Sequence, residues 1–478
     1  MMKEFKVKKG NFIKSNNSTK KMMYHVIISL VPIMLFSFYK NGILPILKGS
    51  GELLDIFKPL MLVIVPMLTC LLVEYIYFII KKDKKNILYL IEESFAFIPG
   101  IFIGLIIPIN TPIWLVVIAA VIASLGKMLF GGLGKNIFNP ALSGAIIIIV
   151  FASAYIGTQG GYLNSYEMDA ISGATPLANF SAVSYAGTYE EIVGPYGSLR
   201  SFFFGNIPGA IGETSAFLCI MAFIYLTINK VIKWRIPVCY VSTVFIMSAI
   251  IGFSNNMGIW YPLFCILSGS VLFGAVFMAT DPVTSPITKH SQVLGGIILG
   301  ILTIGIRFLT NYPEGVLISI LIFNIITIFI NKLSIKFSFN KLYEILSLVL
   351  VIIIALTLSI IISNKIDYNP NSNIDPNFQV TNTEKSGTNI IYYVTSRGFT
   401  GKTSIKSKIT MQNNNIINLE IISNKESYYN LIEESNFLDE IITNQNNLDN
   451  VEAVSGATYT SNYLKELIEK IKVYDRSK

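Results

Sequence analysis

The chain has 478 residues, of which 52% are hydrophobic and 14% charged, and its mean hydropathy is +0.58. Soluble domains carry roughly 25% charged residues, so this composition excludes a purely soluble protein and places most of the chain in lipid. The net charge of +8 does not indicate nucleic-acid binding, because the lysines cluster between apolar runs, as the orientation signals of membrane proteins do.

The predicted fold is a multi-pass α-helical membrane protein of about 11 spans with a C-terminal α+β domain. Segment 1–22 is predicted to be a basic cytoplasmic N-terminus, 23–335 a polytopic membrane domain with an outer loop at 158–207, 336–363 an anchor helix, 364–388 a linker and 389–478 the C-terminal domain. The apolar runs lie at 23–39, 59–80, 87–108, 112–130, 140–157, 208–228, 236–253, 259–279, 292–310, 313–331 and 342–363.

The loop charges predict the orientation in the membrane. Positive residues gather at Lys81–Lys85, at Lys230–Arg235 and at Lys332–Lys341, whereas the intervening loops hold few of them. Because cytoplasmic loops carry an excess of Lys and Arg, the N-terminus is expected inside. Eleven crossings then place the loop 158–207 and everything after residue 363 on the outer face.

The tail after residue 388 has the pattern of a small folded domain. Apolar residues alternate up to Met411 and again from Ile417 across the turn 412–415, which predicts a β-hairpin. Leu464, Leu467, Ile468 and Ile471 then form a helical stripe, so a helix is expected to start shortly after Thr458.

The peptide Ser-Gly-Ala-Thr occurs twice, at Ser172–Thr175 and at Ser455–Thr458. A given tetrapeptide appears by chance in roughly 1% of chains of this length, so two copies indicate a shared role. The motif resembles the site at which a flavin transferase links FMN to threonine through its phosphate. A helix start after each threonine favours this chemistry, because unpaired N–H groups there attract phosphate. The alternative is an ordinary helix cap at each position.

Longer stretches resemble an Rnf-type ion-translocating electron-transport complex. Residues from about 20 to 335 resemble its D-type membrane subunit, which is related to the B-type subunit of the sodium-pumping NADH:quinone reductase, in the stretches 126–142, 172–177, 212–215 and 278–286. Residues from about 342 to 478 resemble the G-type subunit, with its single anchor and outer FMN-binding domain, at Gly398, Gly401, Glu426 and 451–461. One departure is Glu452, where the family has the Asp that Asp169 supplies in the first motif.

The resemblance implies an electron-transfer subunit of a membrane-bound oxidoreductase of the ferredoxin:NAD type. Its implied partners are the other subunits of the complex, a flavin transferase and Na+ or H+, and its implied location is the bacterial cytoplasmic membrane. FMN would be covalently bound at Thr175 and Thr458, as tethers and not as catalytic residues, beside the motif residues Ser172, Gly173, Ala174, Ser455, Gly456 and Ala457. Non-covalent riboflavin is a further cofactor that the family allows.

Other polar residues are weaker candidates for contact with a flavin or an ion. The family motifs contain four candidate flavin or ion contacts: Asn136, Asn139, Glu213 and Asp281. Ionisable residues in or beside apolar runs are either functional or reach water from a span end: Glu74, Glu92, Glu93, Lys127, Glu213 and Arg307. Two histidines and four separate cysteines do not favour a metal site.

Three alternative functions stay open from the sequence. The first is an NADH:quinone reductase-type subunit. The second is a multi-pass solute transporter with an outer flavin-like domain, although a transporter has no need for two phosphoester tethers. The third is a membrane redox sensor, although no inner loop is long enough to fold as an output domain.

Overall fold

The computed structural model describes residues 18–48, 53–81, 86–158, 162–163, 172–173, 175–183, 185–212, 215–310, 312–337, 340–366, 378–386, 389–398, 401–412, 415–424, 429–448, 451–454 and 457–476. The chain forms two compact units. The first comprises residues 1–176, 193–250 and 259–359, and the second comprises 177–192, 251–258 and 360–478.

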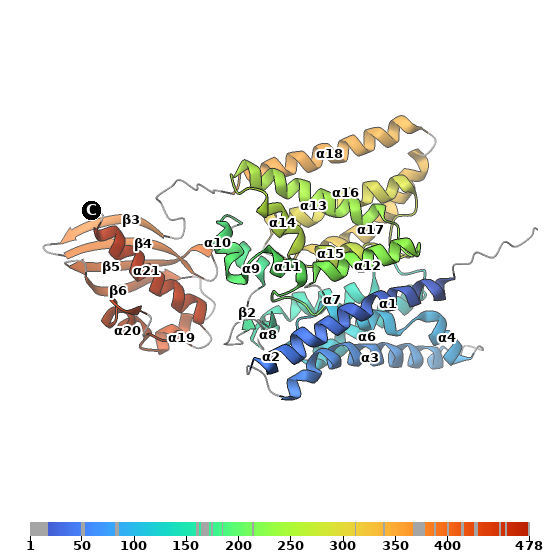
Figure 1. The fold of residues 1–478 in the computed structure, drawn as a ribbon, viewed down its shortest axis with the longest axis horizontal. Helices are drawn as coiled ribbons and strands as arrows, with labels where there is room; N and C mark the ends of the chain where they lie inside the picture. The colour runs from blue at the N-terminus through green and yellow to red at the C-terminus, as the bar shows by residue number, and fades with distance from the viewer. Residues whose placement is uncertain are drawn as a thin grey trace, which may run out of the picture. The chain divides into compact units, whose positions relative to one another are not determined.

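The first unit is helical (Figure 1). Its longer helices are α1 (Thr19–Phe38), α3 (Lys58–Ile80), α5 (Phe97–Ile106), α6 (Ile113–Leu129), α7 (Pro140–Phe151), α12 (Ala216–Ile228), α13 (Arg235–Ser254), α16 (Lys289–Leu309), α17 (Val316–Phe337) and α18 (Lys341–Ser363). Shorter elements are η1 (Tyr39–Ile43), α2 (Leu44–Leu47), η2 (Leu53–Phe57), α4 (Ile87–Ser94), α8 (Ser153–Thr158), η3 (Gly194–Tyr196), α11 (Leu199–Phe204), α14 (Trp260–Leu267), α15 (Val271–Phe273) and η4 (Gly274–Met278).

Within the described residues, six helices are long and apolar enough to cross a membrane. They are formed by Thr19–Leu47, Leu53–Ile80, α13, α16, α17 and α18. A seventh segment, α14 followed by α15 and η4, is bent by 60°. The helices α5, α6, α7 and α12 are apolar but shorter, at 10–17 residues. The protein is therefore a multi-pass membrane protein, and each of the predicted apolar runs contains a helix or a broken helix among the described residues.

Small residues allow the helices of the first unit to approach closely. A Cβ added at Gly104 of α5 would lie 2.2 Å from the Leu62 carbonyl oxygen of α3, and one at Gly144 of α7 would lie 2.2 Å from the Ala119 oxygen of α6. Such contacts are typical of helix interfaces in membranes, where close packing replaces the hydrophobic driving force. This packing holds α3, α5, α6 and α7 together as one cluster.

The second unit contains a four-stranded antiparallel sheet in the order β3-β4-β5-β6. Its strands are β3 (Phe378–Ser386), β4 (Asn389–Gly398), β5 (Gly401–Gln412) and β6 (Asn415–Asn424), and the helices α19 (Tyr429–Glu434), α20 (Phe437–Thr443) and α21 (Thr458–Arg476) follow. A core of apolar side chains joins sheet and helices, and the stripe Leu464, Leu467, Ile468 and Ile471 is buried in it. The predicted helix after Thr458 is therefore confirmed.

The predicted hairpin is confirmed as β5 and β6, but one side chain faces the other way. Register shifts at Lys406/Ser407 and Thr410/Met411 pair Met411 with Ile416. As a result Ile416 is buried, whereas Ile417 is 50% exposed, because a bulge shifts the alternation by one residue. A second difference is that β3 lies within residues 364–388, the predicted linker, because strand pairing with β4 orders a polar sequence that has no clear alternation.

Candidate functional site

Thr175 lies where a short β-pair meets a helix. Ser172 and Gly173 form β2, which pairs with β1 (Tyr162–Leu163), and α9 (Pro176–Ala182) begins directly after the threonine. Proline suits this first helical position because its fixed φ matches the helix and its missing N–H would be unpaired there. The Thr175 side chain is buried, at 5% exposed. Ala174 lies outside the described residues.

Two ionisable residues of the first unit lie at the end of α16 and directly after it. Glu314, in the turn between α16 and α17, is partly exposed. Arg307, in the last turn of α16, is fully buried and its charge acts on the Glu314 carboxyl group. Burial raises the pKa of Glu314 above its ordinary value, and the Thr175 hydrogen bond and Arg307 partly oppose that rise.

Thr458 is the first residue of α21 in the second unit and is partly exposed. The preceding turn is fixed by a 3.0 Å hydrogen bond from the Ala457 amide to the Val454 carbonyl. Ser461 of α21 stabilises the same turn, because its Oγ accepts a hydrogen bond from the Val454 amide at 3.1 Å. The hydroxyl of Thr458 thus stands at the positive end of a 19-residue helix. Ser455 and Gly456 lie outside the described residues.

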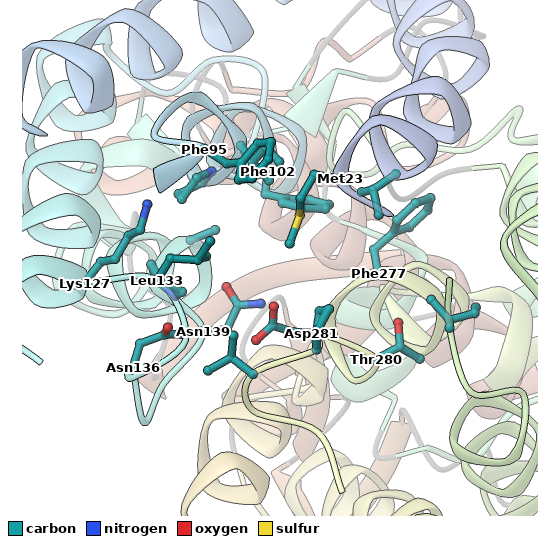
Figure 2. A pocket seen from close by; sticks show the side chains of 18 of the residues that line it. Met23, Phe95, Phe102, Lys127, Leu133, Asn136, Asn139, Phe277, Thr280 and Asp281 are labelled. Atoms are coloured by element: carbon teal, nitrogen blue, oxygen red, sulfur yellow. The ribbon is translucent and has the colours of Figure 1, made fainter. Parts of the chain in front are cut away.

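A separate pocket in the first unit brings together three of the predicted contacts, Asn136, Asn139 and Asp281 (Figure 2). Its cavity volume is about 80 Å³. Ligand pockets in proteins measure roughly 300–1,000 Å³, so this pocket admits a larger organic molecule only when its wall side chains move. Apolar and aromatic side chains form much of the wall, among them Met23, Phe95, Phe102 and Phe277. Glu213 lies outside the described residues.

The polar groups of the pocket are held by short-range hydrogen bonds. Asn139 caps α7 by accepting from the Leu142 amide at 3.3 Å. Asn136 donates to the Phe138 carbonyl at 3.0 Å, while its Oδ1 is buried without a partner among the described residues. Asp281 accepts from the Thr284 hydroxyl at 3.0 Å, and burial raises the pKa of this carboxyl group. The pocket therefore offers a hydrogen-bond acceptor, Asn136 Oδ1, and a carboxyl group, Asp281, for a bound molecule.

Lys127 lies in the wall of the pocket and forms a buried ion pair behind it. Its ammonium group lies 2.8 Å from Glu74 Oε1, and the two side chains are 2% and 0% exposed. It also donates to the Ser94 carbonyl at 2.6 Å, at the end of α4. In the sequence, Lys127 and Glu74 were separate candidates. Their pairing depends on how α3 and α6 pack, which no spacing in the sequence indicates.

Glu314 and the aromatic wall of the pocket were not predicted from the sequence. In the sequence, Glu314 is only an acidic residue at the start of the apolar run 313–331, and charged residues are common at span ends. The predicted polar residues also do not form a single site. Asn136, Asn139 and Asp281 line the pocket, Thr175 is not among its wall residues, and Thr458 belongs to the other compact unit.

Long apolar helices in one unit and a small sheet domain in the other define a multi-pass membrane protein with a C-terminal folded domain. Residues 6–340 match the NQR2, RnfD, RnfE family, and residues 398–471 match the FMN-binding domain. The chain therefore belongs to the NQR2, RnfD, RnfE family and carries an FMN-binding domain in addition, as the sequence resemblance predicted.

Three relatives illustrate the similarity. The chain is 32% identical over 341 residues to the D-type subunit of the proton-translocating ferredoxin:NAD(+) oxidoreductase complex of Clostridium ljungdahlii, covering 70% of this chain and 97% of the relative. It is 31% identical over 323 residues to the Na(+)-translocating counterpart of Acetobacterium woodii, with coverages of 67% and 91%. It is 28% identical over 359 residues to the D-type subunit of the ion-translocating oxidoreductase complex of Haemophilus influenzae, with coverages of 67% and 94%.

Proposed function

We propose that this chain is the electron-transfer subunit of a membrane-bound, ion-translocating ferredoxin:NAD-type oxidoreductase and carries FMN on Thr175 and Thr458. The observation that carries the proposal is the presence, in one chain, of the membrane family, the FMN-binding domain and a Ser-Gly-Ala-Thr motif in each. The relatives named for ferredoxin:NAD(+) oxidoreductase complexes support the partner chemistry. Catalysis then requires the other subunits of the complex.

Each threonine acts as a tether. Attachment forms a bond between the threonine Oγ and phosphorus and breaks the pyrophosphate bond of a flavin dinucleotide donor. The nucleoside monophosphate leaves together with the hydroxyl proton, and a flavin transferase catalyses this exchange. At Thr458 the start of α21 suits the product, because the first amide N–H groups of a helix and its dipole stabilise a phosphate. The bound isoalloxazine supplies the redox chemistry, while the protein supplies position and electrostatics.

The wall of the pocket in the first unit offers contacts for a third, non-covalent flavin such as riboflavin, which would enter once the wall side chains move apart, since the cavity measures about 80 Å³. Phe95, Phe102 and Phe277 provide apolar and aromatic contact for a planar ring. The open Oδ1 of Asn136 can accept a hydrogen bond from a ring N–H, and Asn139 and Asp281 supply further polar contacts.

We further infer eleven crossings of the bacterial cytoplasmic membrane, with both Ser-Gly-Ala-Thr motifs on the outer face. Each of the eleven apolar runs contains a helix or a broken helix, which supports this number of crossings. The positive loops support the orientation. Within the first unit, α2 and α8 lie at one end and α4 at the other, as this topology requires (Figure 1). The coupling ion is Na+ or H+, since the relatives are named for both.

The test is the intact mass of the denatured protein after co-expression with a flavin transferase, with peptide mapping of each adduct. Two FMN phosphoesters, one on each motif threonine, are the expected result. Absence of any adduct, with the transferase active on a control substrate, would overturn the proposal and favour the transporter. An adduct on Thr175 alone would assign the loss to the second motif, where Glu452 replaces the family Asp.

Substitution separates tethering from folding. Thr175→Ala and Thr458→Ala should each remove one FMN, because alanine has no hydroxyl to esterify, and the protein should still insert in the membrane. The measurement is adduct mass together with the yield of membrane-inserted protein. Loss of insertion in either variant would instead show that the threonine acts as a helix cap.

A further inference from the structure

A second, larger cavity adjoins the pocket of the first unit. It lies between the start of α1, the end of α3, α4 and the loop after α6, and is called the outer cavity below. Its volume is about 660 Å³, whereas that of the pocket is about 80 Å³. Lys20 and Glu92 of its wall form an ion pair between exposed side chains. The outer cavity therefore opens to the surface of the unit.

The two cavities have part of their walls in common. Ser94, Phe95 and Leu133 line both of them. Phe95 is the bulkiest of the three, is 6% exposed, and lies in the short connection between α4 and α5 (Figure 2). Ligand pockets measure roughly 300–1,000 Å³, a range that includes the outer cavity but not the pocket alone. Displacement of the Phe95 ring would therefore join the pocket to a space of sufficient size for a ring system.

The backbone of Phe95 is strained but firmly held. Its φ is +50°, a left-handed conformation that is unfavourable for a bulky side chain and free of strain for glycine. On one side, the Ser94 carbonyl and Oγ accept from the Lys127 ammonium group at 2.6 and 2.8 Å. On the other side, the Phe95 carbonyl accepts from the Ile98 amide at 3.1 Å. Strain that persists around an aromatic residue between two cavities points to a role for its ring.

We propose that the ring of Phe95 is a gate between the outer cavity and the pocket, and that a flavin enters the pocket through the outer cavity when this ring rotates. The inference rests on the proposed non-covalent flavin of the pocket. Rotation about the side-chain bonds moves the ring from one staggered conformation to another, while the hydrogen-bonded backbone stays in place. The outer cavity has the volume to receive the ring. Because a ring beside open space has fewer packing contacts on that side, it loses less on rotation than a fully enclosed ring does.

The test is the rate at which riboflavin binds to flavin-free full-length protein in detergent, followed in stopped flow by riboflavin fluorescence. Phe95→Ala should raise the entry rate constant about tenfold or more, because entry no longer waits for a movement of the wall. Phe95→Trp should lower it. Phe102→Ala is the matched control, since Phe102 lines the pocket and is not a wall residue of the outer cavity. Loss of a ring contact alone should speed release in this control and leave entry unchanged.

A second measurement does not depend on flavin binding. Thr280 lines the pocket and is 6% exposed, so Thr280→Cys places a thiol inside it. Labelling of this thiol by a small methanethiosulfonate reagent should be faster when Phe95→Ala is added, and chains without Thr280→Cys correct for the four native cysteines.

The two measurements separate the gate from the flavin. If riboflavin binds and Phe95→Ala enters no faster than wild type, the gate is overturned while the flavin site stands. If wild type binds no riboflavin, the proposed flavin of the pocket fails and labelling decides the gate. Labelling that Phe95→Ala does not accelerate then overturns the gate as well.

Discussion

Single ionisable groups are the points at which this protein departs from an apolar bundle. Glu314 illustrates the physical reason. In the turn between α16 and α17, burial raises the pKa of its carboxyl group, and the Thr175 hydroxyl and the charge of Arg307 partly oppose that rise.

The raised pKa of Glu314 predicts a pH dependence of stability in the unmodified protein. A folded-state pKa above the ordinary value of 4.5 means that the folded state binds the proton more tightly than the unfolded state. This contribution is complete below pH 4.5 and is lost as the pH rises through the folded-state value. Thermal unfolding of purified protein in detergent should show that decline, and Glu314→Gln should remove it from the pH profile. Superimposable profiles of the two proteins would contradict the prediction.

The ion pair of Lys127 and Glu74 couples α6 to α3 at the pocket wall. Removing one partner leaves a buried charge unpaired, so Lys127→Met alone should cost about 3–5 kcal/mol of unfolding free energy. Adding Glu74→Gln should recover much of that loss, because neither charge then remains. A double-mutant cycle by thermal or denaturant unfolding measures the coupling. Additive effects of the two substitutions would show that the pair contributes little.

Helix contact through glycine is the second feature at the scale of elements. Gly144→Ala places a methyl group 2.2 Å from the Ala119 carbonyl and should cost about 1–3 kcal/mol, since backbone must move to accept it. Gly126→Ala in α6 is the matched control, because nothing lies within 4 Å of the added Cβ. The control should be neutral or stabilise by roughly 0.5–1 kcal/mol. Equal unfolding temperatures of the two variants would contradict the close α6–α7 packing.

At the scale of the whole molecule, the chain joins two units with separate cores. The sheet, α19, α20 and α21 enclose an apolar cluster of their own. A fragment of residues 378–478 should therefore fold in water without the membrane helices, as domains of about 100 residues commonly do. Circular dichroism and cooperative thermal unfolding test folding, and incubation with a flavin transferase and donor should then add FMN at Thr458. An unfolded fragment would show that the core depends on the membrane unit.

The joining of the units also bears on electron transfer. If both proposed threonines carry FMN, two tethered flavins on one chain would keep a fixed stoichiometry and a bounded separation, which two separate subunits achieve only by assembly. Fusion does not determine the distance between the flavins. That distance, and the partner that accepts the electron, depend on the assembled complex.

The sequence by itself determined the apolar runs, the family and the repeated motif. These are local properties: a run of about 20 apolar residues forms a helix in lipid whatever surrounds it, because the backbone has no other partner there. The stripe from Leu464 to Ile471 likewise predicted α21, since its period is that of a helix. The threonines of both motifs could be identified from the sequence as well, because a repeated tetrapeptide is also a local property.

Only the tertiary structure decided which distant residues meet. Lys127 lies 53 positions after Glu74, so no periodicity links the two members of this ion pair. The exposure of Ile417 depended on a bulge whose position is set by pairing between β5 and β6. Asn136, Asn139 and Asp281 became one pocket because α7 and the segment after η4 pack together. Contacts of this kind arise from the packing of whole elements, and a linear pattern does not encode that packing directly.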